Sequence, residues 1–284
     1  MTALLVAVAP AVAAPAVAGE FPLPAGNLVG TDNEIVAGPD GNMWVTTDAN
    51  NVVRITPDGT MTPFPLGADA YGITVGPDGN LWASQEIGVV KIDPATGAAV
   101  STAIACGGCR GITSGPDGRI WIVGTNALIS VNPANTADQD ANAITTANPK
   151  GMTTASDGLL WFADGDKVRS ATAAAAPVLT DYTVGGGVQD VGAGPGGQVA
   201  YANAGNNEVG LITPGGTPQR IPVGTSDPFG VAFGADGAFW IARSSTDDLV
   251  RLATDGSFSM LPGFSNAPNV GPRKIAAGPV TPSG

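Results

Sequence analysis

The chain has 284 residues, of which 43% are hydrophobic and only 13% are charged, and it contains 41 glycines and 24 prolines. The apolar fraction excludes a disordered chain, and so many turn-forming residues indicate many short strands. The net charge of −12 argues against nucleic acid or an anionic membrane surface as a partner, and the lack of any histidine excludes a Ser-His-Asp triad, His-ligated zinc and an imidazole base.

The N-terminal residues 4–18 are almost wholly apolar (LLVAVAPAVAAPAVA) and end in Ala16-Val17-Ala18, a small-x-small pattern. This is typical of a secretory signal, although no basic residue precedes it. A lipid or membrane anchor and an artefact of the gene start are the alternatives. We therefore predict a signal-peptide-like segment at 1–18, a single domain at 19–284, and a secreted or cell-surface location with no membrane association after signal removal.

The rest of the chain is built from repeats. The segment GPDGNMW recurs as GPDGNLW, GPDGRIW, ASDGLLW, GPGGQVA and GADGAFW, each about 40 residues after the last. All five tryptophans stand six residues after the first residue of such a segment, and only the fifth repeat lacks one, with Ala200 in its place and Tyr201 beside it. The segments begin at Gly38, Gly76, Gly115, Ala155, Gly194 and Gly234.

Each repeat predicts four short strands. A β-rich run leads into the Pro-Asp-Gly turn, the tryptophan strand follows, and two further strands flank a second turn such as Pro57-Asp58-Gly59. Four strands per 40 residues is the period of a β-propeller blade. We expect the tryptophans to pack between neighbouring blades and the aspartates to belong to the turns, since one Asp per repeat is no calcium ligand cluster.

The two ends continue the pattern. Residues 20–24 (EFPLP) match the outer strand of a blade, and residues 272–279 (PRKIAAGP) begin a seventh repeat. The predicted fold class is therefore all-β, a propeller of four-stranded blades with six complete repeats plus a partial seventh. Either a reduced seventh element closes the ring, or the ring has six blades with spare terminal segments.

One stretch of the first repeat, GPDGNMWVTTDANNVVRITPDGTMTPFPL, carries a family resemblance. Together with GPDGNLW and the G-I runs that begin the blades, it resembles the virginiamycin B lyase (streptogramin B lyase) propellers over about residues 20–279. The resemblance implies a seven-bladed template with a site at the mouth of the central channel. It also implies opening of a cyclic depsipeptide lactone by elimination, with help from a divalent metal.

The resemblance also implies where the catalytic side chains would lie, and here the sequence departs from the family. The family's histidine position, just before each inner strand, holds Asn33, Tyr71, Arg110, Lys150, Gln189, Phe229 and Arg273. The family's glutamate position, three residues after the tryptophan position, holds Thr47, Gln85, Gly124, Asp164, Asn203 and Arg243. No position of the first set is His and none of the second is Glu, so we expect the lyase mechanism to be lost.

The histidine position and the residue after it are called here the first and second mouth positions. The second mouth positions are Glu34, Gly72, Gly111, Gly151, Asp190, Gly230 and Lys274. Four of the 12 basic residues fall among these 14 positions, which favours a basic mouth that attracts a polar or anionic ligand, with solvated loop ends as the alternative. The ligand-binding candidates are Asn33, Glu34, Tyr71, Arg110, Lys150, Gln189, Asp190, Phe229, Arg243, Arg273 and Lys274.

If a base operates at this mouth, the candidates are Lys150, Asp164 and Tyr71. Lys150 and Asp164 share the fourth repeat and can pair across the mouth. A lysine whose pKa is depressed by Arg110 is the best of the three.

Cys106 and Cys109 form a C-G-G-C segment just before Arg110. In an exported protein this spacing favours a local disulfide that stiffens the loop carrying Arg110. Free thiols are the alternative, and a redox or zinc site lacks the helical setting or the further ligands it would need.

Three functions are open at this point. The first is an exported, monomeric binding module for a polar or anionic small molecule, glycan or peptide, with no cofactor. The second is a metal-assisted lyase or lactonase that acts on a cyclic ester with Mg²⁺ or Ca²⁺ held by Glu34, Asp164 or Asp190. Carboxylates converging on one point would favour this enzyme, and Arg or Lys at the centre would oppose it. The third is a structural or partner-binding domain of a surface protein.

Overall fold

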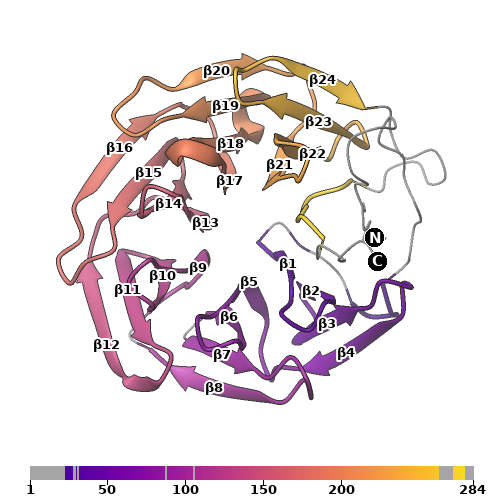
Figure 1. The fold of residues 1–284 in the computed structure, drawn as a ribbon, viewed down its shortest axis with the longest axis vertical. Helices are drawn as coiled ribbons and strands as arrows, with labels where there is room; N and C mark the ends of the chain where they lie inside the picture. Colours follow the sequence, from indigo (N-terminus) through magenta and orange to yellow (C-terminus); the bar gives the residue numbers. More distant parts are fainter. Residues whose placement is uncertain are drawn as a thin grey trace.

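A computed structural model of the chain describes residues 23–27, 30, 32–86, 88–104, 106–261 and 271–278. These residues form six four-stranded antiparallel sheets arranged as the blades of a propeller around a central channel (Figure 1). The prediction of an all-β propeller is therefore confirmed. The signal-like residues 1–18 lie outside the described part of the chain.

Each blade is one up-and-down sheet in sequence order, with its first strand innermost. The first three blades are β1 (Ile35–Ala37), β2 (Met43–Thr46), β3 (Asn51–Ile55) and β4 (Met61–Pro65); β5 (Ala70–Val75), β6 (Leu81–Gln85), β7 (Gly88–Ile92) and β8 (Ala99–Ala103); β9 (Ile112–Ser114), β10 (Ile120–Gly124), β11 (Ala127–Asn132) and β12 (Asn135–Ala143). The last three blades are β13 (Pro149–Thr154), β14 (Leu159–Asp164), β15 (Lys167–Thr172) and β16 (Leu179–Thr183); β17 (Val188–Ala193), β18 (Val199–Asn203), β19 (Glu208–Ile212) and β20 (Gln219–Pro222); β21 (Pro228–Phe233), β22 (Ala238–Arg243), β23 (Asp248–Ala253) and β24 (Phe258–Leu261). Two single-turn 3₁₀ helices, η1 (Pro195–Gly197) and η2 (Ala204–Asn206), flank β18.

The repeated turn between the first two strands of a blade is held by its aspartate. In the second blade, Asp78 accepts hydrogen bonds from the Trp82 indole Nε1 at 3.1 Å and from the Asn80 backbone at 3.2 Å. The same indole-to-aspartate bond occurs in the first, third and sixth blades at 3.0–3.1 Å. The expectation that these aspartates serve the turns is confirmed.

The fourth blade has the tryptophan and the aspartate but not the bond. The Trp161 Nε1 is buried and has no hydrogen-bond partner among the described residues. Its repeat begins with Ala155 rather than glycine. A Cβ added at the equivalent Gly76 would lie 2.6 Å from the Trp82 Nε1, so the space that the methyl of Ala155 fills is the space the bond requires.

The tryptophans pack between neighbouring blades, as the sequence predicted, except for Trp240, which packs against residues 271–278. Trp82 lies in a buried cluster with Ile112 and Ile122 of the third blade, and Trp161 lies in one with Tyr201 of the fifth. In the fifth blade, where Ala200 replaces tryptophan, the ring of Phe239 fills the gap from the next blade.

Residues 271–278 lie between the sixth blade and the first (Figure 1). Ile275 packs against Trp240 of the sixth blade, while Ala276 and Leu23 pack against the core of the first. The segment thus occupies the place of a seventh inner strand. No strand is assigned within residues 271–278, however, so a partial seventh blade is not confirmed.

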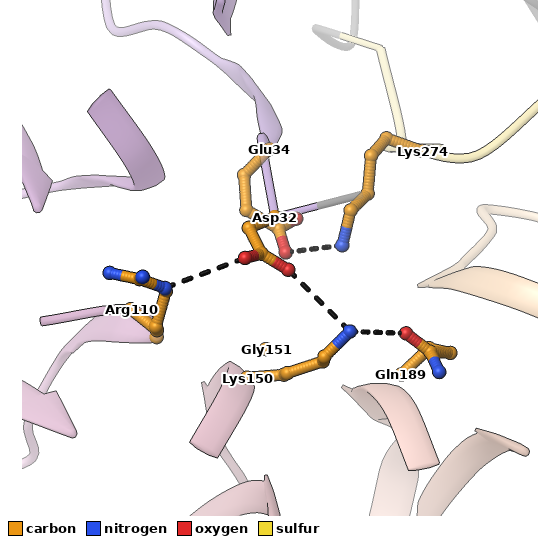
Figure 2. Close-up of a pocket in the computed structure, with 8 residues that line it drawn as sticks. Asp32, Glu34, Arg110, Lys150, Gly151, Gln189 and Lys274 are labelled. Carbon is orange, nitrogen blue, oxygen red and sulfur yellow. Dashed lines mark hydrogen bonds and ion pairs between the residues drawn. The ribbon is translucent and has the colours of Figure 1, made fainter. Parts of the chain in front are cut away.

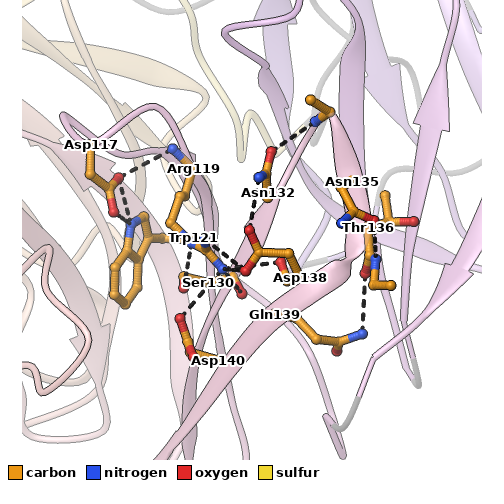
Figure 3. A network of polar contacts seen from close by, with 12 residues as sticks. Asp117, Arg119, Trp121, Ser130, Asn132, Asn135, Thr136, Asp138, Gln139 and Asp140 are labelled. Atoms are coloured by element: carbon orange, nitrogen blue, oxygen red, sulfur yellow. Dashed lines mark hydrogen bonds and ion pairs between the residues drawn. The ribbon is translucent and has the colours of Figure 1, made fainter.

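Most basic residues support the blades rather than the channel. Arg119 reaches from the third blade's turn to the outer strand β12, where it contacts Asp138 at 3.2 Å and Asp140 at 3.4 Å (Figure 3). It also donates to the Ser130 hydroxyl at 2.9 Å. This network ties the long, polar outer strand to the inner part of its blade. Within the described ranges, no helix has the length and apolar character needed to cross a membrane.

Candidate functional site at the mouth of the channel

The inner strands are irregular where they enter the channel. In the second, fourth, fifth and sixth blades the pairing of the inner strand shifts register across the mouth positions, as between Ala70 and Ile73 or between Pro149 and Met152. A bulge re-aims the side chains at that point instead of continuing the alternation of the strand. This is how residues of the first mouth position come to face one another.

The second mouth position is innermost, and in four blades it is glycine for a steric reason. A Cβ at Gly72 would lie 2.7 Å from the backbone oxygen of Arg110, and one at Gly111 would lie 2.2 Å from that of Lys150. The blades therefore approach too closely for a side chain there. The three exceptions carry charge: Glu34, Asp190 and Lys274.

These three charged side chains form one cluster where the ring closes. The Lys274 Nζ lies 2.7 Å from Glu34 Oε1 and 3.7 Å from Asp190 Oδ2. Asp190 also accepts the backbone N–H groups of Val191 at 2.8 Å and Val231 at 3.1 Å. The cluster joins the first blade, the fifth blade and residues 271–278.

Burial sets the protonation of this cluster. Burial and the negative charge of Asp190 raise the pKa of Glu34 from 4.5 to about 7, although Lys274 opposes the change. Burial also raises the pKa of Asp190. Burial lowers the pKa of Lys274, but the two carboxylates outweigh it and raise that pKa above its ordinary value. The cluster of one lysine and two carboxyl groups has no net charge when one of the carboxyl groups keeps its proton.

The first mouth position forms three lateral pairs between neighbours in the ring. The Arg110 guanidinium stacks over the Tyr71 ring at 4.0 Å from its centroid, and Arg273 stacks over Phe229 at 4.8 Å. Lys150 donates to the Gln189 side-chain oxygen at 2.6 Å. The seventh member, Asn33, is fully buried and donates to the Ala70 backbone at 2.7 Å, so it supports the loop.

A small pocket lies inside this ring (Figure 2). Asp32 stands at its centre, with Oδ2 3.4 Å from the Arg110 Nε and Oδ1 3.5 Å from the Lys150 Nζ. Arg110 has a second carboxylate partner, Glu86, at 2.9 Å. Asp32 was missed in the sequence because the residue before the first mouth position is uncharged in every other repeat. The pocket is lined by Asp32, Glu34, Arg110, Gly111, Lys150, Gly151, Gln189 and Lys274.

The partners of Lys150 differ from those suggested by the sequence. Lys150 pairs with Asp32 and Gln189, and Asp164 instead faces the loop that arrives from the third blade. Burial lowers the pKa of Lys150, as expected in direction, but the positive neighbours that add to this are Lys274 and Arg273 and not Arg110. The cations of the mouth are matched by Asp32, Glu34, Glu86 and Asp190, so the basic field suggested by the sequence is largely offset.

Side chains at the family's glutamate position bind the loops that lead into the mouth. Asp164, only 3% exposed, accepts the backbone N–H groups of Ala147 and Asn148 at 2.7 and 2.8 Å and pairs with Arg169 at 3.1 Å. Arg243 pairs with Asp248 at 2.6 Å. The same kind of contact to the entering loop is made by Gln85, Asn203 and Arg243, whose side chains donate to backbone oxygens. Asp164 and Arg243 therefore do not line the pocket.

In the third blade a disulfide, rather than a side chain at the family's glutamate position, fixes the loop that leads into the mouth. The position is Gly124, and a Cβ there would lie 2.5 Å from the sulfur of Cys106. Cys106 is bonded to Cys109, as predicted, and the Gly108 N–H between them donates to the Glu86 backbone at 2.9 Å. The loop that presents Arg110 is fixed by this bond.

A divalent metal of the kind implied by the resemblance does not fit this mouth. The two innermost carboxylates, Glu34 and Asp190, converge on the ammonium of Lys274. A cation already lies where a metal would have to bind, and its charge would repel one. In the described part of the chain, His, Cys, Asp and Glu form no group of three or more that could hold a metal ion.

Comparison with known proteins agrees with this architecture. The sequence model of the virginiamycin B lyase family matches residues 136–280, just over half of the chain. The chain belongs to the virginiamycin B lyase family. A comparison with curated proteins gives no significant match to this chain.

Among solved structures, a streptogramin B lyase has 20% identity and a TM-score of 0.75, covering 89% of this chain and 90% of its own. A catalytically inactive virginiamycin B lyase from Staphylococcus aureus with quinupristin, in which one histidine is replaced by alanine, has 22% identity and a TM-score of 0.72, covering 87% and 90%. An extracellular domain from B. thetaiotaomicron has 13% identity and a TM-score of 0.65, covering 83% of this chain and 37% of its own. At such identities these likenesses show the fold.

Proposed function

We propose that this member of the virginiamycin B lyase family is an exported, monomeric binding module that holds a polar or anionic ligand, such as a small molecule, glycan or peptide fragment, at the mouth of its channel. The observation that carries the proposal is the position of Lys274, whose ammonium fills the centre between the only two carboxylates of the second mouth position. Around it Arg110, Lys150 and Gln189 present donors to the pocket.

The absence of histidine supports binding without lyase chemistry. The S. aureus lyase with one histidine replaced by alanine is catalytically inactive and was obtained with quinupristin. This chain has no histidine anywhere. A propeller of this family that lacks such a side chain retains a mouth shaped to hold a ligand and loses the group that would turn it over.

Export rests on three observations. The first 18 residues have the apolar run and small-x-small pattern of a secretory signal. The chain carries a disulfide, which persists in oxidising compartments. One structural neighbour is an extracellular domain. Mass spectrometry of the protein from a bacterial host would test this, since export predicts a mature N-terminus near Gly19.

The proposed function is tested by screening a library of sugars, sugar acids, short peptides and organic acids for thermal stabilisation of the purified propeller. A ligand of the mouth should lose at least tenfold in affinity when Lys150→Met or Gln189→Leu removes a donor of the pocket. The matched control is Arg220→Gln, because Arg220 pairs with Glu208 on the fifth blade at 2.9 Å and does not line the pocket. Equal loss in the control, or no ligand sensitive to the mouth variants, would contradict the proposal.

A second candidate is a residual enzyme that opens a cyclic ester with Lys150 as base. The observation in its favour is the lowered pKa of Lys150, caused mainly by burial. Incubation with a streptogramin B-type lactone, with magnesium or with chelator, decides between the two, and ring opening is followed by chromatographic retention because elimination leaves the mass unchanged. Opening that Lys150→Met abolishes would favour the enzyme, and no opening by the folded protein would favour the binding module.

A further inference from the structure

The carboxylate at the centre of the pocket is supplied by the chain itself. Asp32 precedes the first blade, but its two oxygens face cations of the third and fourth blades, Arg110 and Lys150 (Figure 2). The side chain thus reaches across the mouth from one side of the ring to the other. Cationic side chains that donate charge-assisted hydrogen bonds to a planar carboxylate bind it strongly.

The closure of the ring does not require a charge at this position. At the equivalent place in the other blades and in residues 271–278 the residues are uncharged and buried: Ala70, Cys109, Pro149, Val188, Pro228 and Pro272. Asp32 is partly exposed, with 30% of its side chain accessible. Its carboxylate therefore faces the pocket, toward Arg110 and Lys150.

The contacts of Asp32 with Arg110 and Lys150 are long compared with the others that the same cations make. They measure 3.4 and 3.5 Å, whereas Arg110 lies 2.9 Å from Glu86 and Lys150 lies 2.6 Å from Gln189. A charge-assisted hydrogen bond is typically about 2.7–2.9 Å long. A free carboxylate, not tethered to the first blade, can approach both cations more closely than Asp32 does.

We propose that Arg110 and Lys150 form a subsite for the carboxylate of a small organic acid, and that Asp32 is an internal occupant which the ligand displaces. This deepens the proposed function and rests on it. The subsite selects a monoanion, because Arg110 already pairs with Glu86 at 2.9 Å, so the two cations leave no charge to match a second negative charge on the ligand. When no ligand is bound, the carboxylate of Asp32 pairs with Arg110 and Lys150. The apparent affinity for the organic acid is therefore reduced by the fraction of time that Asp32 occupies the subsite.

The test compares the wild type with Asp32→Asn and Asp32→Ala, using ¹³C-acetate as the probe and acetamide as its neutral counterpart, at constant ionic strength. Line broadening of the labelled carboxylate gives the dissociation constant. Both variants should bind acetate at least tenfold more tightly than the wild type, and acetamide binding should not change. Arg110→Gln added to Asp32→Asn should abolish the gain.

The matched control is Asp138→Asn, which makes the same change of charge on the outer strand β12 (Figure 3). A gain in this control would show a general effect of charge and would overturn the subsite. Inorganic phosphate bound by Asp32→Asn as tightly as acetate would overturn the choice of a carboxylate monoanion.

Failure of this inference is distinguishable from failure of the proposed function. If neither Asp32 variant gains affinity for acetate while a screened ligand still depends on Lys150 and Gln189, the internal occupant is wrong and the binding module stands. If no ligand of any class responds to the mouth variants, the proposed function falls and this inference falls with it.

Discussion

The two faces of the propeller use the same repeat in opposite ways. On the face of the Pro-Asp-Gly turns, four blades repeat one arrangement of glycine, aspartate and tryptophan, with indole-to-aspartate distances of 3.0–3.1 Å. On the mouth face, the first mouth position holds a different residue in almost every blade. Repetition serves the stacking of blades, and the divergence of the mouth face is what the proposed binding of one particular ligand requires.

The largest effect is expected at the cluster of Glu34, Asp190 and Lys274, which lies on the mouth face and also joins the two ends of the ring. Lys274→Met leaves Glu34 and Asp190 close together without their cation, and removing one partner of a buried ion cluster costs roughly 3–5 kcal/mol of unfolding free energy. Urea denaturation measures this loss. Lys91→Met is the control, because Lys91 pairs with Asp78 at a half-exposed site on the turn face, and it should cost less than about 1 kcal/mol. Equal costs would show that the cluster does not close the ring.

The second effect is the pH dependence of the same cluster. The pKa of Glu34 is raised from 4.5 to about 7, so the folded chain holds this proton more tightly than the unfolded chain does. The resulting stability is complete below pH 4.5 and is lost as the pH rises through about 7, by up to about 3 kcal/mol at 1.4 kcal/mol per pKa unit.

Urea denaturation between pH 5 and 8 measures that slope. The Glu34→Gln variant should have a flatter profile, because its side chain does not titrate. Asp190 adds a slope of the same sign, since its pKa is also raised. A profile of Glu34→Gln that parallels the wild type would contradict the assignment of the proton to Glu34.

The third effect lies on the turn face. Gly76→Ala places a methyl 2.5 Å from Asp78 Oδ1 and 2.6 Å from the Trp82 indole, so the bond between them must break or shift. Loss of a buried hydrogen bond with its donor left unpaired costs about 2 kcal/mol. Gly107→Ala is the control, because an added Cβ there meets nothing within 4 Å. Thermal unfolding compares the two, and similar melting temperatures would mean that the indole bond contributes little.

The smallest effect is expected for the opposite substitution, alanine to glycine, at the equivalent position of the fourth blade. Ala155→Gly makes room for the Trp161 Nε1 to donate to Asp157, but it removes a buried methyl and adds chain entropy, so the net change should be below about 1 kcal/mol. The sharper measurement is the NMR signal of the Trp161 indole proton, which should move downfield when it gains an acceptor. An unchanged signal would show that Ala155 is not what prevents the bond.

Much of this architecture is predictable from the sequence because a repeat with a fixed period presents the same strands, turns and buried side chains several times. The spacing of tryptophans predicted the blades, and the packing of Trp82 on the next blade followed from it. The first mouth position came from the family resemblance, and the structure places Tyr71, Lys150 and Phe229 at equivalent places on bulged inner strands.

What spacing does not predict is the direction of a side chain at the end of a strand. Asp164 and Arg243 were expected at the mouth, but each turns to the loop that arrives from the preceding blade, because that loop offers backbone groups in need of partners. Asp32 was missed for the converse reason. It departs from a position that is uncharged in every other blade, and only the folded ring brings it to Arg110 and Lys150.

The contact between Glu34 and Lys274 joins residues separated by 240 positions in the sequence. Its consequence concerns biosynthesis. A chain that emerges N-terminus first can stack each blade on the one before it, since those contacts are local, but the ring stays open until Lys274 has left the ribosome. Ring closure thus follows the synthesis of all six blades, and until then the apolar face of the first blade that packs against Ala276 stays uncovered.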